Sequence, residues 1–306
     1  MMKRTIQNIM LILILAFFAG NKEANSQVKV HVVSKKQAES FKWKPGEQLE
    51  INGEKAEIYC SAHELNTIEV EIELIAKHKD KTVAEKDLKS LKVMMDKMRG
   101  KVFIRDFIQL DKDNRKPESG LKVVMHIKIP KSCAVTVNNY FGSVNFENVQ
   151  SDLIITGEYS KVNLKDLNGN IKVTSKFGDV TASDVGGVLN ITTNRSDIIL
   201  ENVSGNIYLK STLAEIRITG LKNPEGLIID SKKSKVYISD EHSLDFGYKL
   251  DLEKVDFLKP NWIYLKYIEN EGNIIKANTI DFEESPLIDI KINTGTLSLL
   301  KPNSND

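Results

Sequence analysis

The middle of this sequence repeats itself, and the repeat constrains the fold more than any other feature. From Cys133 to Gly220, aliphatic residues recur every nine residues, and a second apolar residue follows two positions after each. Apolar residues at i and i+2 lie on one face of a short strand, and the spacing leaves room for a turn before the next strand. The repeat therefore predicts ten short strands. Their paired apolar positions are Val135/Val137, Val144/Phe146, Leu153/Ile155, Val162/Leu164, Ile171/Val173, Val180/Ala182, Leu189/Ile191, Ile198/Leu200, Ile207/Leu209 and Ile216/Ile218.

Two kinds of turn alternate between these strands, so the full period is 18 residues. One kind places Asn or Asp before an aliphatic residue, at Asn148, Asp166, Asp184 and Asn202, which suits a tight turn. The other kind is rich in aromatic residues. An 18-residue period with two strands per period is typical of a solenoid. We therefore predict a mainly β fold: a parallel β-solenoid, similar to a β-helix, preceded by a small α+β module. An antiparallel sandwich would also give short alternating strands, but it would not require side chains to recur every 18 residues.

In-register stacking of such repeats, about 4.8 Å apart, predicts ladders of like side chains. We expect these ladders to be structural, that is, to pack the protein interior. The predicted inner ladder is Val149, Leu167, Val185, Val203 and Leu221, and an aromatic ladder of Phe141, Tyr159 and Phe177 is interrupted by Arg195. The outward rows are Asn145, Asn163, Thr181, Ile199 and Arg217 on one face, and Thr136, Ile154, Lys172, Asn190 and Tyr208 on the other. Neither row contains a carboxylate.

The flanking segments differ from the repeat. After Gly220 the register slips by two around residues 223–225, and residues 240–285 are less regular and aromatic-rich, as expected of final coils and a cap. Residues 27–130 show strand patterns at 48–51, 56–60, 67–76, 101–108 and 121–129, with a charged loop at 111–120. The predicted domains are a signal peptide (1–26), an α+β module (27–130) and a β-solenoid with an irregular C-terminal cap (131–306).

One helix is predicted inside the N-terminal module. Thr82 and Glu85 resemble a capping box, an apolar stripe follows, and Gly100 ends the segment. The stripe consists of Ala84, Leu88, Leu91, Met95 and Met98. The cluster of Met94, Met95 and Met98 is expected to pack in or near the core rather than to bind a soft metal.

The first 26 residues predict the compartment. Lys3 and Arg4 precede an apolar run over residues 9–20, and small residues lie before a cleavage position after Ser26. The run would span roughly 18 Å as a helix, too short for a bilayer core of about 30 Å. We expect export to the periplasm, cell surface or medium, with no stable membrane span after cleavage. An oxidising compartment permits a disulfide between Cys60 and Cys133, and two separate buried thiols are an equal alternative.

Charge and motifs exclude several functions. The 43 basic residues nearly balance the 42 acidic residues, which argues against a nucleic-acid partner. The five histidines show no paired metal-ligand spacing, and His78 with Asp80 is expected to form a solvated turn. No HExxH, GxSxG, P-loop or GxGxxG motif is present. We therefore predict no catalytic, cofactor-binding or metal residues and no cofactor. Asp166 and Asp184 stack one period apart and are expected to form turns.

The repeat units also resemble a known family. The segment from Asn168 to Val180, and the lead-in from Gly120 to Pro130, are similar to the DUF4097 family of exported bacterial β-strand-repeat proteins, described as putative adhesins. The resemblance covers residues 45–300 and is strongest over 120–220. It implies an envelope or secreted β-solenoid, with adhesion assigned by analogy, and it transfers no catalytic residues.

Three functions follow from these observations. The first is a non-enzymatic envelope protein whose solenoid surface binds an unidentified envelope protein or polysaccharide. The second is a polysaccharide lyase or hydrolase on the same scaffold, which requires two converging carboxylates. A groove with converging acids and aromatic residues would overturn the non-enzymatic hypothesis and favour this enzyme. The third is a periplasmic structural or signalling component whose partner docks on the N-terminal module.

Overall fold

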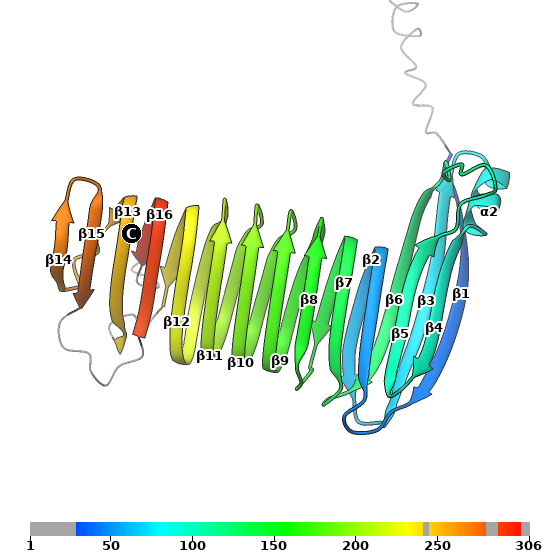
Figure 1. Cartoon of the computed structure of the whole chain (residues 1–306), viewed down its shortest axis with the longest axis horizontal. Helices are drawn as coiled ribbons and strands as arrows, with labels where there is room; N and C mark the ends of the chain where they lie inside the picture. Colours follow the sequence, from blue (N-terminus) through cyan, green and yellow to red (C-terminus); the bar gives the residue numbers. More distant parts are fainter. Residues whose placement is uncertain (1–28, 241–244, 280–286, 301–306) are drawn as a thin grey trace, which may run out of the picture.

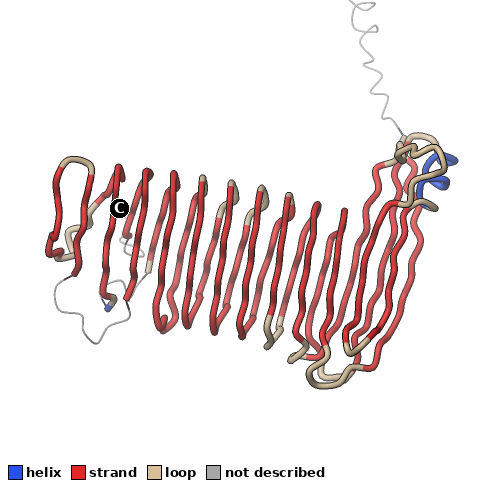
Figure 2. The backbone as a smooth tube through the Cα atoms, viewed as in Figure 1, coloured by secondary structure: helices blue, strands red, loops and turns tan. Residues whose placement is uncertain are grey.

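The chain folds into one long mixed β-sheet that does not close on itself (Figure 1). The structure is a computed structural model that describes residues 29–240, 245–279 and 287–300. In these residues the single helix is α2 (Lys81–Leu88), at the same end of the molecule as the N-terminal strands (Figure 2). No described helix has the length and apolar character needed to cross a membrane. The expected signal peptide, residues 1–26, lies outside the described residues.

The strands follow one another along the long axis of the molecule. The N-terminal strands are β1 (His31–Lys42), β2 (Gln48–His63), β3 (Thr67–His78), β4 (Leu91–Met98), β5 (Lys101–Ile108) and β6 (Gly120–Pro130). The repeat forms β7 (Ala134–Glu147), β8 (Leu153–Glu158), β9 (Ser160–Lys176), β10 (Val180–Asn194), β11 (Ile198–Thr212) and β12 (Glu215–Ser239). The C-terminal strands are β13 (Gly247–Leu258), β14 (Leu265–Glu271), β15 (Ile274–Thr279) and β16 (Leu287–Leu300). Their order is β1-β3-β6-β2-β7-β8-β9-β10-β11-β12-β16-β13-β15-β14, and β5 joins β4 to β2.

The repeat strands pair in parallel with an offset equal to the sequence period. Val162 pairs with Val180, and Val180 pairs with Ile198, each 18 positions further along the chain. Most of the predicted short strands are joined in pairs within longer strands, as in β9. The offset grows to 20 between Ile207 and Leu227, after register shifts near Gly205. The slip of two predicted after Gly220 is therefore confirmed.

Side chains alternate between the interior and the surface as the repeat predicts. Every paired apolar position from Val135 to Ile218 is buried, and so is the inner ladder from Val149 to Leu221. Burying one such side chain stabilises the fold by about 1.5–3 kcal/mol. The two predicted outward rows are also confirmed: Asn145 pairs with Asn163 on one face, and Thr136 pairs with Ile154 on the other.

The predicted turns adopt the left-handed backbone that favours Asn and Asp. Asn148, Asp166, Asp184 and Asn202 have φ between 51° and 60°. The turn-forming role of Asp166 and Asp184 is therefore confirmed.

The predicted helix from Thr82 to Gly100 is wrong beyond Leu88. The side chain of Asp80, rather than Thr82, caps α2 by accepting from the backbone N–H of Thr82 at 2.7 Å. Residues 91–98 form β4, which pairs antiparallel with β5 through a tight turn at Arg99 and Gly100 (φ 52° and 77°). Gly100 therefore makes a hairpin turn instead of ending a helix.

The methionine cluster follows the alternation of this strand. Met95 is half-buried and packs against the core, but Met94 and Met98 are 50% and 57% exposed. Because alternate residues of β4 face opposite sides, the expectation of core packing is wrong for these two.

Strand β2 connects the N-terminal strands to the repeat. It pairs in parallel with β6 on one side and with β7 on the other, where Ile58 lies opposite Val144. A single hydrophobic core cluster runs from Phe41 to Leu299. At the other end, β16 inserts between β12 and β13 and is parallel to both. The antiparallel pairs at both ends, such as β1 with β3, make the whole sheet mixed.

Candidate functional site

A stack of aromatic rings lies along one turn edge of the repeat. Phe141 and Tyr159 stack with ring centroids 5.3 Å apart, and Tyr159 and Phe177 stack at 4.9 Å. The guanidinium of Arg195 lies 5.6 Å from the centroid of Phe177. The aromatic ladder predicted from the sequence is thus present, and Arg195 continues it by a cation–π contact instead of interrupting it.

Tyr140 lies beside this stack and not at its end. Its ring is nearly perpendicular to those of Phe141 and Tyr159, at centroid distances of 4.6 and 5.9 Å. A ring at the end of the stack would be much further from Tyr159, since Phe141 and Tyr159 are themselves 5.3 Å apart. Tyr140 therefore contacts both rings in an edge-type arrangement and is not part of the parallel stack. The Tyr140 side chain is 44% exposed.

A cavity of about 620 Å³ adjoins Tyr140, and we call it the edge cavity. It lies where β2, β5, β7 and β8 come together near the turn edge. Its lining residues are Asn52, Gly53, Glu54, Arg105, Asp106, Asn138, Asn139, Tyr140, Thr156 and Glu158. The size is within the range of small-molecule sites. Three carboxyl groups and one aromatic ring therefore meet in one hollow.

Asp106 is the buried acid of this cavity, with 3% of its surface exposed. The backbone N–H of Glu54 donates to both of its carboxylate oxygens, at 3.1 and 3.2 Å, and the N–H of Lys55 donates to Oδ2 at 3.3 Å. Burial raises the pKa of Asp106 from 3.8 to about 6, and these backbone donors oppose the rise. Asp106 thus fixes the backbone of Glu54 and Lys55, which lie between the part of β2 that pairs with β5 and the part that pairs with β6.

Three further polar side chains of the cavity, those of Asn138, Asn139 and Glu158, contact residues of neighbouring strands. Asn138 Nδ2 donates to Asn52 Oδ1 at 3.0 Å, across the β2–β7 pair. Glu158 lies 3.4 Å from the Nζ of Lys176 in an ion pair. Asn139 is 3% exposed, and its Nδ2 donates to the Ala56 carbonyl and to Ser160 Oγ. Its Oδ1 is buried without a hydrogen-bond partner among the described residues.

These three acids were not among the residues predicted from the sequence. Glu54, Asp106 and Glu158 come from three separate strands and match no motif. One signal was available: Asp106 takes the next inward position after Val102 and Ile104 in an alternating strand, where an apolar residue is usual. The outward rows that the sequence analysis searched contain no carboxylate, because the edge cavity lies at the turns.

A second hollow, of about 360 Å³, lies on the outer face of the sheet, and we call it the outer-face hollow. The rings of Tyr59 and His126 stack along one wall at 5.1 Å. Asn163 Nδ2 donates to Asn145 Oδ1 at 2.8 Å, and Asn145 donates to the Ile58 carbonyl. These amides therefore stabilise the stacked strands as well as lining the hollow.

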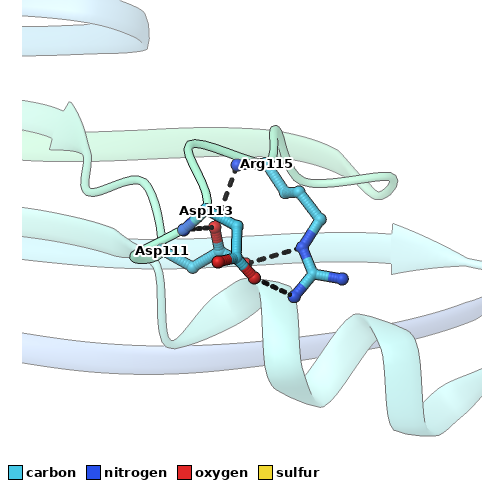
Figure 3. Close-up of polar contacts among 3 residues, drawn as sticks. All are labelled: Asp111, Asp113 and Arg115. Atoms are coloured by element: carbon cyan, nitrogen blue, oxygen red, sulfur yellow. Dashed lines mark hydrogen bonds and ion pairs between the residues drawn. The ribbon is translucent and has the colours of Figure 1, made fainter.

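The charged loop predicted at 111–120 is present, and ion pairs between its own residues hold it together (Figure 3). Arg115 contacts Asp113 at 2.7 Å and Asp111 at 3.2 Å, and Asp111 Oδ1 accepts the backbone N–H groups of Asp113 and Arg115 (Figure 3). The pKa of Asp111 lies below its ordinary value, mainly because the backbone N–H of Arg115 donates a hydrogen bond to its carboxylate. Asp111 and Asp113 are therefore compensated by contacts within the loop.

The predicted histidine and cysteine positions do not converge on a site. His78 Nδ1 accepts the backbone N–H of Asp80 at 3.0 Å, in the turn before α2. His242 lies outside the described residues. Cys60 and Cys133 are buried and unbonded, and burial raises the pKa of the Cys133 thiol to about 12. Within the described residues, no group of three or more His, Cys, Asp or Glu is arranged to hold a metal ion.

Comparison with known proteins identifies a family. The model of the family described as Toastrack DUF4097 matches residues 22–298. No curated protein matches the chain.

Several solved structures are distantly similar to the chain, and each similarity covers 88% of it. A putative adhesin from Bacteroides fragilis has 10% identity and a TM-score of 0.39, with 97% of that chain covered. A putative cell adhesion protein from Clostridium sporogenes has 11% identity and a TM-score of 0.30, with 100% covered. A putative lipid binding protein from Parabacteroides distasonis has 9% identity and a TM-score of 0.33, with 97% covered. Similarities at this level carry no argument about function.

Proposed function

The chain belongs to the Toastrack DUF4097 family, and we propose that it is a non-enzymatic, exported envelope protein of adhesin type. In this proposal the repeat is a β-solenoid, and its rigid surface binds a polysaccharide or protein of the cell surface. The observation that supports the proposal most is the edge cavity, which is lined by the exposed ring of Tyr140 together with several hydrogen-bonding side chains. An aromatic face beside polar groups is a common arrangement in binding sites.

The state of the acids favours binding over catalysis. Both oxygens of Asp106 are held by backbone N–H donors, and Glu158 is paired with Lys176. A general acid must reach the glycosidic oxygen, whereas the Asp106 side chain is nearly inaccessible. Asp106 and Glu158 are therefore better suited to shaping the cavity than to transferring a proton to a substrate.

Capture of envelope material tests this function. The full chain is immobilised and exposed to envelope extracts of the producing bacterium, and bound polysaccharide and protein are quantified. We expect the column to retain surface polysaccharide or a surface protein. The control column carries the same amount of chain, unfolded in urea before its free coupling sites are blocked, and we expect it to retain less. Equal retention on both columns would contradict a binding scaffold. Recovery of one periplasmic protein without surface material would instead favour a structural or signalling role.

A carbohydrate-active enzyme is the second candidate, since three carboxyl-bearing residues and an aromatic ring converge in the edge cavity. The pKa of Asp106, raised to about 6, is a further property of glycosidase acids. Release of reducing ends or of unsaturated uronates from polysaccharides would support this candidate. That activity must be lost in Asp106→Asn or Glu158→Gln to be assigned to this cavity.

A further inference from the structure

We propose that the edge cavity binds a non-acidic pyranose unit of a polysaccharide, stacked on the exposed ring of Tyr140. This inference rests on the proposed function, because it names the ligand class of the same scaffold.

The ring geometry makes Tyr140 the platform of this aromatic cluster. The faces of Phe141, Tyr159 and Phe177 are turned toward one another, and Arg195 lies against the last of them. Tyr140 stands perpendicular to this stack, is 44% exposed and lines the cavity, so its ring is the aromatic group that a ligand in the cavity can contact. A pyranose has a face of C–H groups that packs on an aromatic face while its hydroxyl groups point outward.

Those hydroxyl groups would meet suitable partners. The carboxylates of Glu54 and Glu158 accept hydrogen bonds, and the guanidinium of Arg105 donates them. Because the side chains of Asp106 and Asn139 are fixed by hydrogen bonds to the backbone, part of this wall is arranged before a ligand arrives.

The charge of the cavity selects against acidic sugars. Glu54, Asp106 and Glu158 outnumber Arg105, and the ammonium of Lys176 is paired with Glu158. A uronate placed on Tyr140 would lie near carboxyl groups of the same sign, which disfavours its binding. Neutral sugars carry no such penalty.

Affinity electrophoresis of the full chain tests the ligand class. Native gels contain yeast mannan, barley β-glucan or polygalacturonate at graded concentrations, and retardation yields a Kd. We expect at least one neutral polymer to retard the protein and polygalacturonate not to do so. Tyr140→Ala is expected to raise the Kd about tenfold, and Tyr140→Phe to leave it within about twofold, because the ring is kept.

Two further variants locate the site. Tyr208→Ala is the matched control, since Tyr208 is 41% exposed on a repeat strand and does not line the cavity. Tyr59→Ala reports on the outer-face hollow. Circular dichroism and thermal unfolding of each variant must match the wild type, as expected for exposed side chains.

Three results would overturn the inference. They are retardation by polygalacturonate alone, an unchanged Kd in Tyr140→Ala, and a loss of binding in Tyr59→Ala without a loss in Tyr140→Ala. The last two leave the proposed function standing, because binding persists at another surface. If no polymer retards the protein, the pyranose assignment fails, and the envelope-capture experiment decides separately whether the scaffold binds at all.

Discussion

Asp106 shows how one residue can oppose the pattern of its own strand. In β5, Val102 and Ile104 point into the core, and Asp106 takes the next inward position. An unpaired buried carboxylate would be costly, but the backbone N–H groups of Glu54 and Lys55 compensate part of that cost. The result is an acid whose pKa lies near 6.

This pKa predicts the pH dependence of stability. Because the folded pKa of about 6 exceeds the ordinary 3.8, the folded state keeps a proton between these values that the unfolded state has lost. The stabilisation from this group is therefore complete below about pH 4 and is lost as the pH rises through about 6. The rise in pKa corresponds to roughly 3 kcal/mol. Urea unfolding measures the unfolding free energy of the wild type minus that of Asp106→Asn. We expect this difference to fall by about 2–3 kcal/mol from pH 4 to pH 7, because only the wild type loses the stabilisation. Parallel pH profiles would exclude this explanation.

At the scale of elements, the turn edge beside the cavity combines backbone strain with ring stacking. Tyr159, Phe177 and Arg195 have φ between 51° and 58°, a region that bulky side chains disfavour. Each of these residues belongs to the aromatic stack or covers it. The stacking contacts thus offset an unfavourable backbone, and the rings are held in one orientation next to Tyr140.

The stacking of the repeat also dictates which turn positions require glycine. Gly205 has φ +81°, and a Cβ there would lie 2.2 Å from the carbonyl oxygen of Gly187 in the next turn. Gly46 has φ +89°, but a Cβ there would have no atom within 4 Å. We expect Gly46→Ala to cost about 1 kcal/mol from backbone strain alone, and Gly205→Ala at least about 3 kcal/mol. Chemical unfolding of both variants measures the difference, and equal losses would show that the turns do not stack this closely.

The segment 81–100 shows why local apolar spacing misled the helix prediction. Leu91 and Met95 suit a helical stripe, yet Leu91, Val93 and Met95 equally suit one face of a strand. The hairpin with β5 decides between these patterns, because it satisfies the backbone of β4 and packs Leu91 on the core. Asp80 and the Arg99–Gly100 turn then define where the helix begins and where the strand ends.

At the scale of the whole molecule, β2 makes the N-terminal strands part of the sheet that carries the repeat. It covers β7 along most of its length and places Leu49, Ile51 and Ile58 in the common core. Without β2, the edge of β7 would lack its hydrogen-bond partner. The stability of the repeat is therefore expected to depend on residues before Pro130.

Truncation tests this dependence. A chain of residues 131–306, compared with the full chain, should aggregate or lose its cooperative unfolding transition, because the β7 edge and the side chains beneath β2 become exposed. Size-exclusion chromatography and urea unfolding measure both effects. A monomeric fragment that unfolds as cooperatively as the full chain would contradict the prediction and would support 131–306 as an autonomous domain.

The repeat could be predicted from the amino-acid sequence: its strands, inward pairs, outward rows and turn positions. This was possible because the offset between paired residues equals the period of the chain, so the local pattern of Val162 and Val180 already contains the register. Other features depend on contacts between segments that are distant in the chain. Gly53 pairs with Asn139, and β16 inserts between β12 and β13. These pairings join segments that are far apart in the chain, and no repeat in the sequence specifies them. The edge cavity is built from these distant pairings, which is why the sequence predicted its scaffold and the aromatic stack but not its acids.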